Sequence, residues 1–432
     1  MALARTAPLR EAMAEAIPDR PFTVAFWDGT ELDGTADGPR FTARSPRALA
    51  YALTAPGELG IGRAYVSGAL DVDDMDAAVE IVRAWTPPSF DRATKARLML
   101  AALRAVGITR PPPRPQAELV PEGRRYTLSR DNRSVRHHYD LPPEFFALFL
   151  DQSMTYSCAI FSRGATTLEE AQEAKLELVC TKLGLKPGER VLDVGCGWGS
   201  FALHAAQRHG VSVVGITLSP PQAETARRRA AEAGLADKVE IRVQDWRDLP
   251  GERFDAIASI GMVEHVGDDS IDDYAVRLRG LLGPGGRLLN HGIARLTLGD
   301  PRGGPFTQRY VFPDGAPLPL SRMALAFERA GLTIDHVEGL ALDYAETLRH
   351  WYTRLDDRLD EARRLAGDER VRVWRLYLRA ARWGFLNDFT SIYQVRATPA
   401  DQPREARMPM VASTSSVSPS GSSSGSPVMT TP

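Results

Sequence analysis

Residues 191–206 read VLDVGCGWGSFALHAA, and this stretch decides the fold. An apolar run at 190–194 enters a turn with glycines at 195, 197 and 199, and a helical pattern follows at 200–208. Glycine lets a backbone turn tightly and approach a ligand without a Cβ in the way. The pattern predicts a strand, a ligand-binding turn and a helix, although a turn that serves helix packing alone would have the same letters.

Strand and helix patterns alternate on both sides of this turn. Thr167 and Glu170 form a capping box that predicts a helix running to about residue 183. Downstream, strands are expected at 212–217, 238–243, 254–260 and 286–292, with helices at 220–233 and 270–282. Strands that alternate with helices predict an α/β fold with a mostly parallel, doubly wound sheet.

Composition divides the chain into four parts. Residues 1–109 are expected to form a small N-terminal α+β domain, with strands at 22–27 and 39–44 and helices at 46–55, 74–85 and 91–106. The remaining parts are a Pro-rich linker at 110–129, the α/β domain at 130–396 and a tail at 397–432. The tail is rich in Ser, Pro, Thr and Gly, which predicts disorder.

The bulk properties restrict partners and location. The chain has 432 residues with a formal net charge of −2, so no overall attraction to nucleic acid is expected. Three cysteines, Cys158, Cys180 and Cys196, are too few for a disulfide framework and fit a reducing cytoplasm. No signal-peptide pattern and no long apolar run are found, and no metal site is expected.

The glycine-rich turn distinguishes between two nucleotide cofactors. A dinucleotide site would place its third glycine one residue later and an acidic residue after the second strand, where GITLS stands at 215–219. The pattern Asp193-x-Gly195-x-Gly197-x-Gly199 resembles instead the S-adenosylmethionine site of class I methyltransferases. Without that acid, Thr217, Leu218 and Gln222 are the candidates around the cofactor.

A further cofactor contact is expected after the third strand of the α/β domain. Asp245 can accept a hydrogen bond from the adenine amine, and Trp246 can flank the ring. A loop acid and an edge aromatic residue remain an equal alternative. Ligands in such sheets lie at the carboxyl ends of the strands, which is where these residues stand.

Four scattered motifs extend the resemblance to a family. They are HYDL at 138–141, MTYSCAIF at 154–161, IGMVEHVG at 260–267 and NHGI at 290–293. Together with LDVGCGWG and GITLSPPQ, they resemble the cyclopropane-fatty-acyl-phospholipid synthase family over residues 130–396. A weaker resemblance lies at 62–68, GRAYVSG, where Arg63 replaces the usual Glu.

The resemblance implies an enzyme that transfers the methyl carbon of S-adenosylmethionine to the double bond of an unsaturated acyl chain. It adds Tyr156 and Ser157 to the cofactor site. It also implies that bound bicarbonate deprotonates a carbocation, held by Cys158, Glu264, His291, Ile293 and Tyr344. Taken singly, a buried thiol, a core histidine and an ion-paired glutamate are ordinary structural residues.

The N-terminal domain favours a phospholipid substrate, because family members that act on carrier-bound mycolic acid precursors lack it. The basic helix 91–106 and the Arg-rich segment 363–382 are then expected to meet an anionic membrane surface from the cytoplasm, although ordinary solvated helix faces would have the same pattern.

Two product classes and two other functions stay open. The product is either a cyclopropane or a 10-methylene chain, and the second would need a separate reductase partner to become a saturated branch. A second copy of the chain, forming a homodimer, is a further candidate partner. The alternatives in function are a methyltransferase for a soluble small molecule and a non-catalytic lipid-binding protein.

Overall fold

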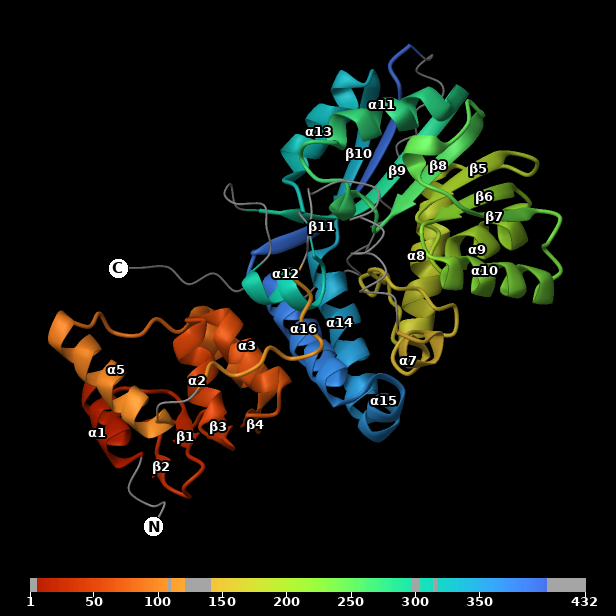
Figure 1. Cartoon of the computed structure of the whole chain (residues 1–432). Coiled ribbons are helices and arrows are strands. Elements are labelled where there is room, and N and C mark those ends of the chain that lie inside the picture. Colours follow the sequence, from red (N-terminus) through yellow and green to blue (C-terminus); the bar gives the residue numbers. More distant parts are fainter. Residues whose placement is uncertain are drawn as a thin grey trace, which may run out of the picture.

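The computed structural model describes residues 6–107, 110–120, 141–296, 304–313, 315 and 317–401. A small N-terminal domain lies beside a larger domain built around one sheet (Figure 1). Two long helices of the larger domain, α14 (Ala341–Asp356) and α16 (Asp368–Leu386), stand between that sheet and the N-terminal domain. The HYDL motif falls largely outside the described residues.

The N-terminal domain is α+β, as predicted. Its sheet has the order β2-β1-β3-β4, made of Glu31–Leu32, Thr23–Ala25, Arg40–Ala43 and Leu70–Val72. Its helices are α1 (Ala7–Ala16), α2 (Arg47–Thr54), α3 (Glu58–Val66), α4 (Met75–Ala84) and α5 (Arg92–Val106). The sequence patterns missed α1, α3 and β4, whose apolar residues show no clear period.

The large sheet has seven strands in the order β10-β11-β9-β8-β5-β6-β7. β5 (Arg190–Val194), β6 (Ser212–Thr217), β7 (Val239–Val243), β8 (Phe254–Ile260) and β9 (Leu282–Arg295) pair in parallel, so the doubly wound prediction is confirmed. β10 (Leu332–Gly339) and β11 (Thr390–Pro399) add an antiparallel edge that the sequence did not predict. Because β11 ends at Pro399, the boundary of the tail at 397 was placed three residues too early.

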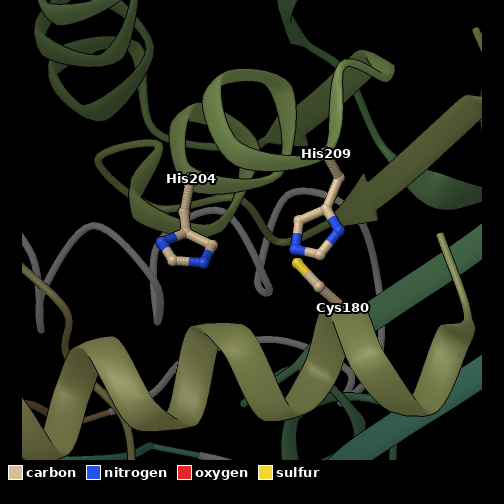
Figure 2. A group of neighbouring side chains, drawn as sticks. All are labelled: Cys180, His204 and His209. Carbon is tan, nitrogen blue, oxygen red and sulfur yellow. The ribbon is translucent and has the colours of Figure 1, made fainter. Parts of the chain in front are cut away.

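Helices cover both faces of this sheet. The predicted helices are α8 (Leu168–Leu183), α9 (Ser200–His209), α10 (Pro220–Glu232) and α11 (Ile271–Leu281). The remaining ones are α7 (Pro143–Ala147), α12 (Pro305–Tyr310), α13 (Leu320–Arg329) and α15 (Leu359–Ala366), with short 3-10 turns at Trp246–Asp248 and Val263–His265. α8 and α9 pack together and bring Cys180, His204 and His209 face to face (Figure 2). No helix in the described part of the chain combines the length and apolar character that a membrane span requires.

Arginines of α16 hold the N-terminal domain in place. The Arg372 guanidinium binds the Asp71 carboxylate and the carbonyl oxygens of Tyr65 and Leu70. Arg379 bridges Asp76 and Asp356. The side chains of Arg372 and Arg379 are only 11% and 8% exposed, so the prediction that the 363–382 segment meets a membrane is wrong for them. These two arginines instead form ion pairs with carboxylates of the N-terminal domain.

The segment before the α/β domain packs against both domains. Arg63 forms a two-pronged ion pair with Glu118, whose carboxylate also accepts the Tyr310 hydroxyl. The Tyr51 hydroxyl donates to the carbonyl oxygen of Pro113. Residues 110–120 of the predicted linker are therefore an ordered segment that packs against both domains.

Candidate active site

A cavity opens at the carboxyl ends of β5, β6 and β7. It encloses about 1110 Å³ of space, including its open mouth. Ten of the eleven predicted cofactor residues line it: Tyr156, Ser157, Asp193, Gly195, Gly197, Thr217, Leu218, Gln222, Asp245 and Trp246. The crevice at strand C-termini is where ligands bind in open α/β sheets.

The exception is Gly199, which does not line this cavity. It caps α9 with φ +85°, and a Cβ at this position would lie 3.1 Å from the Cβ of Ala226 on α10. The left-handed backbone and this close approach both favour glycine for helix packing, and the prediction that Gly199 binds the cofactor stays a prediction. Gly195 and Gly197 have φ values of +79° and +54°, and both face the cavity.

Two carboxylates present unused acceptors in this cavity. Asp193 is the last residue but one of β5, and its Oδ2 has no hydrogen-bond partner; burial raises its pKa to about 7. Asp245 accepts two bonds from Arg247 through Oδ1, while its Oδ2 is also buried and unpartnered. Buried acceptors of this kind fit a ligand that brings N–H or O–H donors.

The loop with Tyr156 and Ser157 forms the opposite wall and is fixed by α8. The Gln172 amide donates to the Ser157 carbonyl at 2.8 Å, and the Lys175 ammonium donates to the Ser157 hydroxyl at 3.1 Å. Lys175 is fully buried, which lowers its pKa to about 8. Gln172 and Lys175 were missed by the sequence reasoning. Two polar residues three positions apart on the buried face of a capped helix were the available signal.

A second cavity adjoins the first and is mostly apolar. It encloses about 1270 Å³, including its mouth, and shares Tyr156, Ser157, Gly261 and His265 with the first cavity. Aromatic side chains dominate its wall: Phe306, Phe312, Tyr344, Tyr377, Trp383, Phe385 and Phe389. The two cavities therefore meet at one place, where a polar ligand and an apolar ligand would touch.

Three of the five predicted catalytic residues, Glu264, Ile293 and Tyr344, line this apolar cavity beside the junction. Glu264 accepts the backbone N–H of Ile293 through Oε1 at 2.6 Å, and its Oε2 is buried without a partner. Burial raises the pKa of Glu264 to about 7. A carboxyl group with such a pKa can take up a proton near neutral pH.

The other two residues, Cys158 and His291, line neither cavity. The Cys158 thiol points at the carbonyl oxygens of Ala159 and Leu340, and burial raises its pKa well above the ordinary range. His291 is held through Nδ1 by the amide of Gln394, which leaves Nε2 buried and unpartnered. The prediction of five residues around one ligand is thus only partly met, because side-chain direction cannot be read from motif order.

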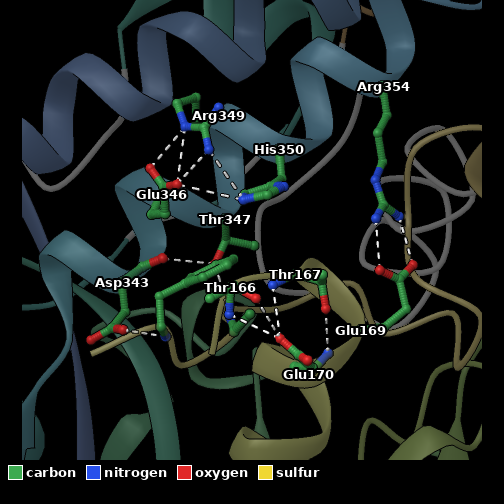
Figure 3. Close-up of polar contacts among 12 residues, drawn as sticks. Thr166, Thr167, Glu169, Glu170, Asp343, Glu346, Thr347, Arg349, His350 and Arg354 are labelled. Carbon is green, nitrogen blue, oxygen red and sulfur yellow. Dashed lines mark hydrogen bonds and ion pairs between the residues drawn. The ribbon is translucent and has the colours of Figure 1, made fainter. Parts of the chain in front are cut away.

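α14 ties this region together (Figure 3). Asp343 accepts the backbone N–H groups of Phe161 and Ser162, and Thr347 receives the N–H of Ala159 at 3.0 Å. A two-pronged Arg354–Glu169 ion pair joins α14 to the first turn of α8, next to the Thr167–Glu170 capping box. The loop 154–161 is therefore clamped from two sides.

Comparison with known proteins gives this geometry a context. The family model for mycolic acid cyclopropane synthetase matches residues 126–395, more than half of the chain. A probable fatty acid methyltransferase of Mycobacterium tuberculosis, Rv3720, is 38% identical over 90% of this chain and 94% of its own length. The cyclopropane-fatty-acyl-phospholipid synthase of Escherichia coli is 34% identical over 78% of this chain and 82% of its own.

Among solved structures, the cyclopropane synthase MmaA2 of Mycobacterium tuberculosis superimposes with a TM-score of 0.59 at 34% identity. The match covers 97% of that chain but 62% of this one. The mycolic acid cyclopropane synthase CmaA1, solved with S-adenosylhomocysteine, gives a TM-score of 0.58 at 33% identity over the same shares. The class I methyltransferase fold is thereby confirmed.

Proposed function

The chain belongs to the mycolic acid cyclopropane synthetase family and is an S-adenosylmethionine-dependent methyltransferase, and on that premise we propose that it methylates the double bond of an unsaturated acyl chain in a phospholipid. The junction of a polar cavity and an aromatic-lined cavity carries this proposal. At this junction, the sulfonium methyl group of a bound cofactor would lie next to the double bond of an acyl chain.

The residues of the first cavity fit the cofactor. The unpartnered oxygens of Asp193 and Asp245 can accept from its amine and hydroxyl groups, and the backbone at Gly195 and Gly197 leaves room for close approach. When bound, S-adenosylmethionine supplies an electrophilic methyl group. The alkene donates its electron pair to that carbon, the carbon–sulfur bond breaks, and a carbocation remains on the acyl chain.

The apolar cavity protects this cation. Its aromatic faces stabilise positive charge, and its apolar wall excludes the water that would trap the cation. The cation then loses a proton, from the new methyl group to give a ring, or after a hydride shift to give a methylene chain. Glu264 Oε2 stands beside the cavity to receive or relay that proton.

Bicarbonate as the base is part of the proposal. Glu264 Oε2, which lines the apolar cavity, can accept from it. His291 Nε2 is an unpartnered donor, since Nδ1 accepts from Gln394, but His291 lines neither cavity. The Cys158 thiol and the Ile293 amide are engaged elsewhere, so they do not support it here. Rates measured in carbon dioxide-free buffer, with and without added bicarbonate, distinguish bicarbonate as the base from Glu264 as the direct base. A rate that does not respond to bicarbonate would leave Glu264 as the direct base.

The shorter mycolic acid enzymes leave the N-terminal part of this chain unmatched, and the Escherichia coli relative is named for a phospholipid. These facts support a phospholipid substrate.

α5 supports peripheral binding to the cytoplasmic membrane face, because Met99, Leu100 and Leu103 are about half exposed beside the exposed cations Arg92 and Lys95. Equal pelleting of the protein with anionic and zwitterionic liposomes would show that the cations of α5 do not attract it to anionic lipid.

The direct test is incubation of the protein with oleoyl phospholipid and methyl-labelled S-adenosylmethionine, followed by mass spectrometry of the acyl chains. The proposal predicts a gain of one labelled carbon. Methylation of a soluble nucleophile without any change in lipid would support the soluble-substrate alternative instead.

A further inference from the structure

A third cavity lies between the two domains. It encloses about 560 Å³, including its mouth, and its wall is almost wholly apolar. α3, α4 and the N-terminal sheet form one side, and α16 forms the other. Its apolar lining includes Phe41, Ile61, Val72, Met75, Val79 and Leu376.

This interdomain cavity adjoins the aromatic-lined cavity of the active site. The two share Arg83, Phe306 and Ala380 as lining residues, so they lie on two sides of one wall. The wall is closely fitted, because a Cβ on Gly62 would lie 2.4 Å from the Phe306 ring. The N-terminal domain therefore creates an apolar space directly beside the reacting one.

A cation stands where the two cavities meet. Arg83 lines both, and its guanidinium lies 3.2 Å from the Glu58 carboxylate. Both side chains are about one quarter exposed, so an incoming anion can reach Arg83 from solvent. Guanidinium groups bind phosphate oxygens through paired N–H donors.

We propose that the interdomain cavity holds the second acyl chain of a diacyl phospholipid, with the reacting chain in the active-site cavity and the phosphate at Arg83. A phospholipid has two apolar chains that diverge from one glycerol bearing an anion. Two apolar cavities that meet at one cation have the matching arrangement. This inference rests on the proposed function and narrows its substrate to lipids with two chains.

The test compares dioleoyl phosphatidylglycerol with its single-chain 1-oleoyl analogue in detergent micelles. Val79→Phe fills the interdomain cavity from α4, away from the reacting groups. It should lower kcat/KM for the diacyl lipid at least tenfold relative to the single-chain lipid. Arg83→Gln should lower kcat/KM for both phospholipids relative to methyl oleate, which lacks a phosphate.

A loss of folded protein lowers kcat/KM for both lipids equally, so it does not change the ratio of the two values. An unchanged ratio in Val79→Phe, with single-chain activity retained, would overturn the assignment of the cavity. A wild-type protein that methylates none of these lipids would overturn the proposed function itself. Leu325→Phe, at an exposed position on α13, is the matched control and should leave the ratio unchanged.

An independent observation concerns the cluster between α8 and α9 (Figure 2). Donor atoms of Cys180, His204 and His209 all lie within 4.8 Å of one another. Glu177, one turn before Cys180, adds a carboxylate oxygen 3.2 Å from His204 Nε2 and 3.1 Å from His209 Nε2. Ligands of tetrahedral zinc stand about 3.3–3.8 Å apart, given zinc–ligand bonds of about 2.0–2.3 Å. The widest separations here, up to 4.8 Å, would therefore shorten by about 1 Å when an ion binds.

We infer that these four side chains bind one zinc ion. Thiolate, imidazole and carboxylate are the ligand types that zinc takes, and the partly exposed histidines leave a path for its entry. α8 carries Gln172 and Lys175, which hold the Ser157 loop, and α9 follows the glycine-rich turn. The ion would clamp together the two helices that support the cofactor cavity. The proposal departs from the expectation in the sequence analysis that no metal site is present.

Untagged protein should retain close to one zinc per chain after dialysis, measured by plasma mass spectrometry. Cobalt in its place should give a thiolate-to-metal absorption band that Cys180→Ser abolishes. His209→Gln should weaken zinc affinity at least tenfold, whereas Cys196→Ser should not change it. Less than a tenth of an ion per chain, or binding that these variants leave unchanged, would overturn the site.

Discussion

Replacing Glu264 by Gln should separate the function of this residue from its effect on stability. Glutamine has the same shape and can still accept the Ile293 N–H through its carbonyl oxygen. It cannot take up a proton. Loss of a positioned base typically lowers a rate by about 10²–10⁴-fold, so kcat should fall by this order while the fold persists.

The effect on stability depends on pH. Burial raises the pKa of Glu264 to about 7 from 4.5, so the unfolded chain ionises first as pH rises. The stability that the protonated carboxyl contributes is complete below pH 4.5 and is lost as pH rises through 7. One pKa unit corresponds to about 1.36 kcal/mol, and integration from pH 5 to pH 8 gives a loss of about 2.5 kcal/mol. Because glutamine does not titrate, the variant should not lose this free energy of unfolding as pH rises.

Urea unfolding of the wild type and Glu264→Gln at pH 5 and pH 8 measures this difference. The free energy of unfolding of the variant, relative to wild type, should rise by about 2.5 kcal/mol between the two pH values. Glu328→Gln, an exposed carboxyl on α13, is the control and should show no such rise. The same relative stability at both pH values would show that Glu264 does not titrate differently in the folded protein, and full activity in Glu264→Gln would show that it is not the base.

Gly195→Ala forces a Cβ onto a backbone with φ +79° at the cofactor cavity and should weaken S-adenosylmethionine binding at least tenfold by calorimetry, whereas Gly280→Ala on α11 should not. Arg372→Ala leaves Asp71 paired with Arg44 alone and removes the bonds to the Tyr65 and Leu70 carbonyls, so it should destabilise docking by about 1.5–3 kcal/mol, seen as faster proteolysis between the domains. Lys175→Met removes the donor to Ser157 and should raise the KM for the cofactor without unfolding the chain. The wild-type rate should rise with pH to a plateau above about 7, and a flat profile would argue against Glu264 as the proton acceptor.

The fold could be predicted from sequence where local patterns are strong. The capping box at Thr167, the strand at 190–194 and the alternating elements up to β9 were all found, because each has its own period and its own stop signals. β10 and β11 were missed. They form an antiparallel pair from segments more than fifty residues apart, and no local pattern encodes that pairing.

The cofactor site was predicted better than the catalytic one. Ten of its eleven residues line one cavity, because the carboxyl ends of parallel strands converge in any such sheet. Cys158 and His291 line neither cavity, since side-chain direction depends on packing against the start of α14 and against β11. The interdomain contacts of Arg372 and Arg379 looked like a solvated basic face, because sequence cannot show which surface another domain covers.

Transfer of a methyl carbon to a phospholipid acyl chain can be measured by mass spectrometry of the products formed from oleoyl phosphatidylglycerol and ¹³C-methyl S-adenosylmethionine, for wild type and Glu264→Gln. We expect one labelled carbon on the acyl chain of the intact phospholipid, as a ring or a methylene group, and strongly reduced product from the variant. An unlabelled lipid from folded, cofactor-bound wild-type protein with bicarbonate present would contradict this expectation.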